Sequence, residues 1–193
     1  MKLHEFTSYE EYLNTQFATF AQKAGSCWLS PSEKPVLRRI VQDYQDEDIP
    51  FGICHGVRTG SELVAFQGMT ANVVGTDVGT SLHTLEGVHV IVHDFQKPIP
   101  GYEGLADFVY SNSLDHASDP KRALQVWTEQ LWPGGLLLLH WSPDHNNESP
   151  ATWADCFAAS LDEYRELMTE VVDHVADVPT GFKERVVLVG RKA

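Results

Sequence analysis

The sequence is poor in basic side chains and has no long apolar run. Its 193 residues include 14 lysines and arginines against 27 aspartates and glutamates, a formal charge of -13. Binding to nucleic acid requires clustered lysine and arginine, so this composition argues against a DNA or RNA partner. No stretch approaches the roughly 20 consecutive apolar residues that span a bilayer. The N-terminal sequence MKLHEFTSYEEY has acids where a signal peptide has its apolar core. We therefore expect a cytoplasmic protein with no membrane partner.

Cysteine is also scarce. Cys27, Cys54 and Cys156 form no Cys-x-x-Cys pair, which excludes the common zinc and dithiol motifs and predicts buried, reduced thiols. The histidines and aspartates likewise have no recognised metal-binding spacing, so we expect no metal. The hydrophobic fraction of 42% and the charged fraction of 21% are those of an ordinary globular protein. The length predicts a single domain, residues 1–193.

Apolar periodicity predicts strands that alternate with helices. The expected strands are 51–54, 72–77, 88–92, 107–110 and 136–141, and the expected helices are 8–23, 33–44, 59–67, 119–131 and 153–172. Two further strands, 174–178 and 185–189, should form an antiparallel hairpin around a Pro-Thr-Gly turn.

The apolar character of these strands predicts the fold class. Near-continuous runs such as the leucines of 136–139 are typical of a mostly parallel sheet that helices cover on both faces. The fold class is therefore α/β, a Rossmann-like doubly wound sheet of seven strands in which only the last strand is antiparallel. Residues 49–193 form this core. Residues 1–48 form an N-terminal helical lid region, which the loop 142–150 completes.

Two segments have the pattern of a nucleoside site. Ile53–Gly60 is a strand that runs into a glycine-containing turn and then a helix, and Val73–Asp77 is a strand that ends on an acid. Such a turn brings backbone N–H groups close to the ligand, and the acid accepts hydrogen bonds from ribose hydroxyls. Asp77 follows Gly60 by 17 residues and Gly56 by 21, close to the expected spacing of roughly 20.

Polar residues also follow the third and fourth strands. Asp94 and Phe95 offer a carboxylate for the amino group of an adenine and a ring that packs on the base. Residues 111–113, Ser-Asn-Ser, lie where ligands bind in open α/β sheets, outside the carboxyl ends of the strands. His116 and His140 are the candidate acid–base groups, because histidine takes up a proton near neutral pH. A structural hydrogen bond within its loop is the alternative for His116.

Together these motifs resemble the class I S-adenosylmethionine-dependent methyltransferases. The segments that carry the resemblance lie within 51–141 and read ICHGVRTGSE, VVGTD, HDFQKPIP and ADFVYSNSLDHASDPKRALQVWTEQLWPGGLLLLH. The resemblance implies S-adenosylmethionine as the cofactor and methyl transfer to a small-molecule acceptor. The cofactor-binding residues that it implies are His55, Gly56, Val57, Arg58, Gly60, Asp77, Val78, Asp94, Phe95, Ser111 and Asn112.

The turn departs from the family pattern at two positions. Cys54 stands where the family usually has an acid that helps to hold the methionine end of the cofactor, and Arg58 replaces a glycine. Arg58 either pairs with the cofactor carboxylate, narrows the pocket or points to solvent. A nucleoside-binding protein that does not methylate is therefore the alternative function. A nicotinamide oxidoreductase is less favoured, because the turn lacks G-x-G-x-x-G and the C-terminal hairpin is unexpected there.

Overall fold

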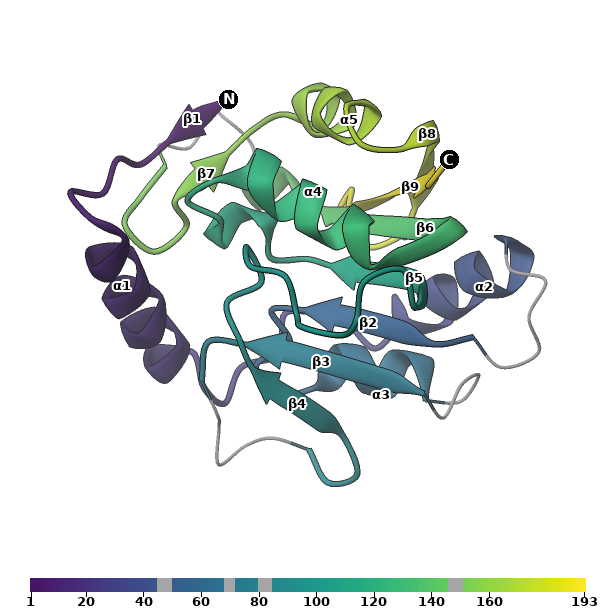
Figure 1. Cartoon of the computed structure of the whole chain (residues 1–193), viewed down its shortest axis with the longest axis horizontal. Helices are drawn as coiled ribbons and strands as arrows, with labels where there is room; N and C mark the ends of the chain where they lie inside the picture. The colour runs from purple at the N-terminus through teal and green to yellow at the C-terminus, as the bar shows by residue number, and fades with distance from the viewer. Residues whose placement is uncertain (45–49, 68–71, 80–84, 146–150) are drawn as a thin grey trace.

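Figure 1 shows the computed structural model of the chain, which describes residues 1–44, 50–67, 72–79, 85–145 and 151–193. A seven-stranded sheet in the order β4-β3-β2-β5-β6-β9-β8 forms its centre. The strands are β2 (Gly52–His55), β3 (Val73–Asp77), β4 (His89–Val92), β5 (Ala106–Ser111), β6 (Leu131–Trp141), β8 (Asp173–Pro179) and β9 (Val186–Arg191).

The direction of the strands confirms the predicted fold class. From β4 to β6 all neighbours are parallel. β9 pairs antiparallel with β6 on one side and with β8 on the other. β8 therefore runs with the parallel strands, and β9 alone is reversed in this sheet. The predicted hairpin is confirmed.

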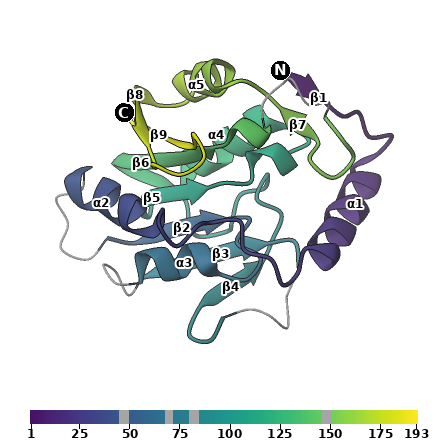
Figure 2. The same cartoon turned by 180° about the vertical axis from the view of Figure 1, so that it is seen from behind.

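Helices cover both faces of the sheet. α4 (Pro120–Gln130) and α5 (Leu161–Thr169) lie on the face seen in Figure 1. α2 (Lys34–Tyr44) and α3 (Ser61–Phe66) lie on the opposite face, which Figure 2 shows. The N-terminal helix α1 (Tyr9–Gln22) covers neither face. It lies beyond the carboxyl ends of β2 and β3, at the edge of the sheet where the site is found.

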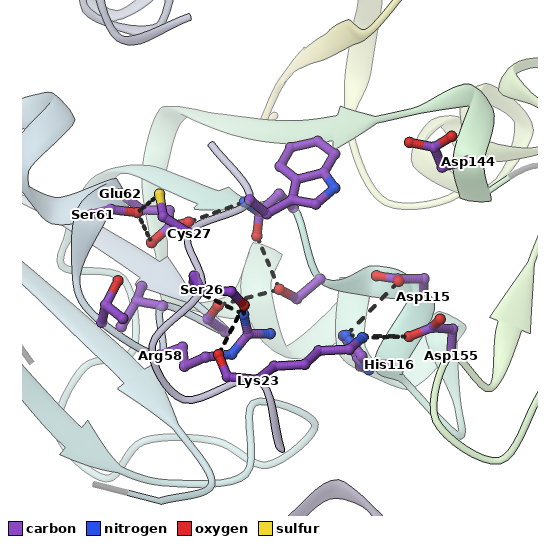
Figure 3. Close-up of a pocket in the computed structure, with 16 residues that line it drawn as sticks. Lys23, Ser26, Cys27, Arg58, Ser61, Glu62, Asp115, His116, Asp144 and Asp155 are labelled. Atoms are coloured by element: carbon purple, nitrogen blue, oxygen red, sulfur yellow. Dashed lines mark hydrogen bonds and ion pairs between the residues drawn. The ribbon is translucent and has the colours of Figure 1, made fainter. Parts of the chain in front are cut away.

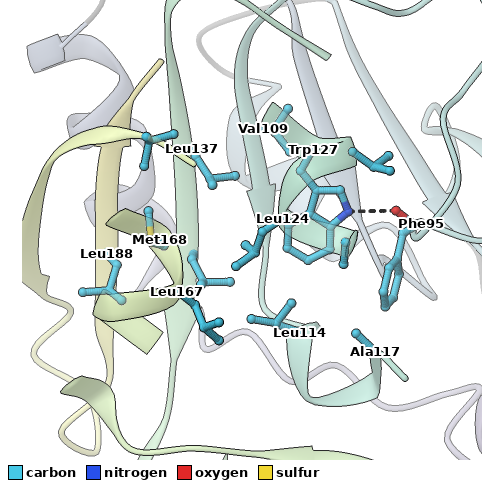
Figure 4. Close-up of a cluster of buried hydrophobic side chains, with 14 of the residues drawn as sticks. Phe95, Val109, Leu114, Ala117, Leu124, Trp127, Leu137, Leu167, Met168 and Leu188 are labelled. Carbon is cyan, nitrogen blue, oxygen red and sulfur yellow. Dashed lines mark hydrogen bonds between the residues drawn. The ribbon is translucent and has the colours of Figure 1, made fainter. Parts of the chain in front are cut away.

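Successive side chains of β6 point to opposite faces of the sheet and so contribute to the core on both sides. Leu137 and Leu139 belong to the cluster beneath α4 and α5, whereas Leu136 and Leu138 belong to the cluster beneath α2 and α3, as the period of two along a strand requires. The first cluster closes around Trp127, which is fully buried and whose indole N–H donates to the carbonyl of Phe95 at 2.9 Å (Figure 4). This bond fixes the segment that follows β4 against α4.

The predicted helix over 153–172 is wrong. α5 begins only at Leu161, and it is preceded by a short strand, β7 (Phe157–Ala158), which pairs with β1 (Lys2–Leu3). Ser160 caps α5, because its side chain accepts from the backbone of Glu163 while the Glu163 carboxylate accepts from the backbone of Ser160. This reciprocal capping box fixes the start of the helix.

A buried polar cluster ties the segment before α2 to the C-terminal hairpin. The guanidinium of Arg185 donates to Glu33 at 2.9 Å and to the carbonyl of Trp28 at 3.1 Å, and it lies 3.5 Å from the centre of the Trp28 ring. His140 Nε2 lies 3.2 Å from Glu33, and its other ring nitrogen is hydrogen-bonded to Tyr110 at 2.9 Å. Burial works to raise the pKa of Glu33, but hydrogen bonds with His140 and Ser30 outweigh it and hold the pKa at about 2.

Candidate functional site

The turn after β2 is the centre of the site, and its backbone has three residues at positive φ. These are Gly56 at φ 74°, Arg58 at φ 41° and Gly60 at φ 82°. A side chain at Gly56 would place its Cβ 2.4 Å from the hydroxyl of Ser113, so only glycine allows the turn to lie against the end of β5. The N–H of Gly56 donates to Thr76 at 2.9 Å, which holds the turn to the end of β3 as well.

Asp77 lies at the carboxyl end of β3 with its carboxylate fixed by the backbone. One oxygen accepts from the N–H of Arg58 at 2.8 Å, and the other accepts from the N–H of Val78 at 2.7 Å. Burial raises the pKa of Asp77, although these two N–H bonds work in the opposite direction. The side chain is 9% exposed, and each oxygen keeps a lone pair for a further donor. This geometry suits a pair of neighbouring hydroxyl groups.

The carboxylate of Asp77 faces a small pocket of about 40 Å³, whereas pockets for small molecules are usually about 300–1,000 Å³. Side chains of α1 form one wall of the pocket and residues at the strand ends form the other. The lining includes Tyr12, Gln16, Thr19 and Phe20 from α1, and Gly56, Arg58, Asp77, Val78, Phe95, Ser113 and His116 from the core.

Two tyrosines hold α1 over this small pocket. The hydroxyl of Tyr9 donates to the carboxylate of Asp94, and the hydroxyl of Tyr12 donates to the carbonyl of His116 at 3.2 Å. Asp94, predicted to contact adenine, is thus bound to α1 and lines neither the small pocket nor the larger one beside it. Phe95, predicted to pack on the base, does line the small pocket.

A larger pocket of about 440 Å³ lies on the other side of the turn. Figure 3 shows Ser61 and Glu62 on one of its sides and Asp115, His116 and Asp155 on the opposite side. The side chains of Lys23 and Arg58 extend between them. Gly56, Arg58, Ser113 and His116 line both pockets, so the two cavities meet at the turn.

His116 has a defined tautomer on the wall of this larger pocket. Its Nδ1 lies 2.9 Å from the carbonyl oxygen of Ala154, which can only accept, so Nδ1 carries the proton. In the neutral ring the lone pair is then on Nε2, which lies 3.9 Å from a carboxylate oxygen of Asp115 and 3.7 Å from one of Asp155. Such an imidazole can take a proton from a bound molecule. The predicted alternative, a structural hydrogen bond, is thus also present.

The same three side chains bring ligand atoms for a metal within 4.8 Å of one another. The chain itself supplies a cation at this position, because the ammonium of Lys23 lies 3.1 Å from Asp155. The absence of a metal stays a prediction.

Besides Asp94, three of the predicted site residues have side chains that line neither pocket. Ser111 is buried and donates to the carbonyl of His55 at 3.1 Å. His140 is held in the cluster around Glu33. His55 lies in the core between Thr76 at 2.7 Å and Gln130 at 2.8 Å, and burial lowers its pKa to about 3. Gly60 shapes the turn and also stays outside the lining. The side chains of Ser111, His140 and His55 thus make buried contacts within the core and do not face the cavities.

Other predicted residues do reach the cavities. Val57 and Asn112 line the larger pocket. The guanidinium of Arg58 donates to the carbonyl of Ser26 at 3.3 Å and to its hydroxyl at 3.1 Å. It therefore anchors the segment after α1 over the pocket, and its pairing with a cofactor carboxylate stays a prediction. Cys54 and Cys156 are buried as predicted, but Cys27 is exposed and lines the larger pocket.

Several lining residues were not predicted. Glu62, Lys23, Asp155 and Tyr12 come from four separate parts of the chain. An acid in the first turn of a helix, such as Glu62, is common and carries no functional signal by itself. In the described part of the chain, no helix is both long and apolar enough to cross a membrane.

Neither a protein-family model nor a curated protein sequence matches this chain. The fold, by contrast, occurs in many solved structures. One is the 1,6-didemethyltoxoflavin-N1-methyltransferase of Burkholderia thailandensis, solved with S-adenosylhomocysteine. Its TM-score is 0.72 at 16% identity, over 98% of this chain and 92% of that one. The sugar N-methyltransferase KedS8 from Streptoalloteichus sp. ATCC 53650 gives 0.68 at 16% identity, over 100% and 98%.

The chain therefore has the fold of the class I S-adenosylmethionine-dependent methyltransferases, as its motifs predicted. The [4+2]-cyclase SpnF is also similar, with a TM-score of 0.64 at 12% identity over 94% of this chain and 93% of that one. One fold thus carries more than one reaction, and the reaction has to be argued from the site.

Proposed function

We propose that this protein is an S-adenosylmethionine-dependent methyltransferase that acts on a small-molecule acceptor. The observation that carries the proposal is the backbone-fixed carboxylate of Asp77 beside the glycine turn at which the two pockets meet. Bound S-adenosylmethionine supplies a methyl group on a positively charged sulfur, which a nucleophile displaces in line. The residues of the chain position the two molecules and handle one proton.

In this proposal the small pocket holds the nucleoside. Asp77 accepts from the two ribose hydroxyls, and Val78 and Phe95 pack against the base. The backbone at Gly56 and Val57 approaches the ligand closely, because no side chain stands at Gly56. Residues 1–48 act as the lid of the single domain 1–193. Since α1 fills the nucleoside side, it moves outward to admit the cofactor and releases Asp94 from Tyr9 for the adenine amino group.

The larger pocket holds the methionine end of the cofactor and the acceptor. Arg58 and Lys23 offer cations for the carboxylate of the cofactor. Asp115, Asp144 and Asp155 line the same cavity, and their negative charge favours an acceptor with a basic nitrogen. The names of two similar structures, both N-methyltransferases, support this class of acceptor. His116 takes the proton of the attacking nitrogen at Nε2, since its Nδ1 is already protonated.

The test is calorimetry with S-adenosylmethionine and S-adenosylhomocysteine, followed by methyl transfer to a panel of small amines. We expect both nucleosides to bind and at least one amine to be methylated. NADH is the control ligand, and binding of NADH alone would favour the oxidoreductase instead. Absence of binding by both nucleosides would overturn the proposal.

A second candidate is a nucleoside-binding protein that does not methylate. The small volume of the nucleoside pocket, the missing acid at Cys54 and the similarity to a cyclase favour it. It predicts that S-adenosylhomocysteine binds but that no methyl group leaves S-adenosylmethionine with any amine in the panel.

A further inference from the structure

Glu62 is a buried acid on the wall of the larger pocket. It belongs to the first turn of α3, and only 4% of it is exposed. One carboxylate oxygen accepts from the side-chain amide of Asn112 at 3.2 Å, and the other accepts from the hydroxyl of Ser61 at 3.0 Å. Figure 3 shows Glu62 across the cavity from the acids around His116. The carboxylate is therefore positioned rather than free to rotate.

The groups that donate hydrogen bonds to Glu62 are neutral, and they accept hydrogen bonds in turn from other neutral groups. The thiol of Cys27 donates to Ser61 at 2.9 Å, and the hydroxyl of Ser113 donates to the amide oxygen of Asn112 at 2.9 Å. The second bond orients the amide, so that its NH₂ group faces Glu62. A chain of donors that ends on one carboxylate is suited to its ionised form.

No cation of the described residues forms an ion pair with this acid, although the guanidinium of Arg58, which lines the same pocket, acts on it from a longer distance. Among the described residues, no lysine, arginine or histidine nitrogen lies within 4.0 Å of the Glu62 carboxylate. Burial raises the pKa of Glu62, although the hydrogen bonds from Asn112 and Ser61 and the charge of Arg58 work in the opposite direction. An ionised carboxylate that is out of water and has no cation in contact is costly. A positively charged ligand group in the pocket would remove that cost.

The position of Glu62 indicates which cation this is. Asp77 lines only the small pocket and Glu62 lines only the larger one, and Gly56 lies on the wall of both. A ligand that binds its ribose at Asp77 and passes Gly56 therefore brings its other end into the larger pocket, where Glu62 is the acid that belongs to the helix following the turn. In the cofactor of the proposed function, that end is an amino acid. Its ammonium has three N–H donors for carboxylate lone pairs, whereas the sulfonium has none.

We propose that Glu62 binds the α-ammonium group of the cofactor and supplies from α3 the negative charge that Cys54 does not supply from β2. This inference rests on the proposed function. It makes Glu62 the residue that distinguishes S-adenosylmethionine and S-adenosylhomocysteine from nucleosides that lack the amino acid. Asn112 and Ser61 orient the carboxylate for this contact.

The experiment compares two ligands on two proteins by calorimetry. The ligands are S-adenosylhomocysteine and its analogue without the α-amino group, and the proteins are the wild type and Glu62→Gln. The wild type should bind the analogue about 10- to 100-fold more weakly, as expected for the loss of a charge-assisted contact. Glu62→Gln should weaken S-adenosylhomocysteine by a similar factor and leave the analogue within about twofold. Glu166→Gln, the same change on the exposed face of α5, should alter neither.

Each alternative result contradicts a different step of the inference. Equal weakening of both ligands by Glu62→Gln would make Glu62 a structural residue. Equal affinity of the wild type for both ligands would exclude the ammonium contact, even if the variant failed to fold. If the wild type bound neither S-adenosylhomocysteine nor S-adenosylmethionine, the proposed function itself would fail first. Thermal unfolding of each variant shows whether it is folded before binding is measured.

Discussion

The two pockets that meet at Gly56 are built in different ways. In the small one, about 40 Å³, side chains of α1 form one wall, and Asp77 is the acid among the lining residues. The larger one, about 440 Å³, carries Glu62, Asp115, Asp144 and Asp155 together with Lys23, Arg58 and His116. The first is thus narrowed by the protein's own helix, whereas hydrogen bonds and ion pairs orient several charged groups of the second.

Because of this difference, the free energy of ligand binding should have different contributions in the two pockets. In the small pocket, which the proposed function assigns to the nucleoside, a ligand would have to replace the contacts of Tyr9 and Tyr12, so part of its binding energy would go into moving α1. In the charged pocket, the groups are already oriented by hydrogen bonds to their neighbours, so a ligand gains contacts with little rearrangement. Substitutions in the two pockets should therefore have different effects.

The largest effect is expected at His116. His116→Ala removes the proposed proton acceptor of the larger pocket, so turnover with the best amine acceptor should fall about 100-fold or more. The affinity for S-adenosylhomocysteine, measured by calorimetry, should change less than about threefold. A parallel loss of turnover and affinity would mean that His116 binds the cofactor and is not the base.

Asp77→Ala tests the nucleoside pocket. Loss of a charged acceptor for two hydroxyls should weaken S-adenosylhomocysteine by about 10- to 150-fold, or about 1.5–3 kcal/mol. 5′-Methylthioadenosine, which lacks the amino acid, should weaken by the same factor. Asp173→Ala on the exposed start of β8 is the matched control. An unchanged dissociation constant would leave Asp77 as a turn residue only.

The burial of His55 should make the free energy of unfolding depend on pH. The pKa of His55 is lowered to about 3 by burial, whereas a histidine in the unfolded chain titrates near 6.5. Between these values only the unfolded state binds the proton. The stability present above pH 6.5 is therefore lost as the pH falls, at about 1.4 kcal/mol per pH unit.

Denaturant unfolding between pH 6.5 and 4.5 measures this slope. The window avoids Glu33, because the stabilisation from its low pKa is lost only as the pH falls from about 4.5 toward about 2. His55→Asn should be less stable at pH 7 and have a flatter slope. An unchanged slope would mean that His55 is already protonated in the folded protein.

The smallest effect is expected at Tyr9. Tyr9→Phe removes the hydroxyl that binds Asp94 and should weaken the closed position of α1 by about 1 kcal/mol. Because less energy is then needed to open the pocket, S-adenosylhomocysteine should bind up to about fivefold more tightly. Tyr102→Phe, which removes a hydroxyl from a ring that packs against Phe51 before β2, is the control. Weaker binding in Tyr9→Phe would show that this contact belongs to the ligand-bound form.

The sheet was predictable because its strands carry local signals. The leucines of β6 and the acid at the end of β3 identify buried parallel strands, and the Pro-Thr-Gly turn identifies the hairpin. The error at residues 153–172 came from counting apolar residues across Ser160. The spacing Ser160-x-x-Glu163 is a capping-box signature and marks the true start of α5.

The site was predictable only where one short segment forms it. Gly56, Arg58 and Asp77 lie in or next to a single βαβ unit, so their spacing carries the information. Lys23 and Asp155 are 132 residues apart and meet only when the segment after α1 folds against the segment before β7. His55 and His140 share the residue type of a catalytic group, and only the folded structure places them in the interior, outside the lining of both pockets.

The position of α1 affects the rates at which a ligand binds and leaves. If the closed arrangement predominates, a cofactor cannot enter faster than the helix swings away, whatever its concentration. The observed association rate should therefore rise with ligand concentration and then level off at the opening rate of α1, on the microsecond-to-millisecond scale of collective motions. In the proposed function, release would be limited by the same event, because the product nucleoside would lie behind the same helix. Tyr9 and Tyr12 would thus set the residence time of the spent cofactor.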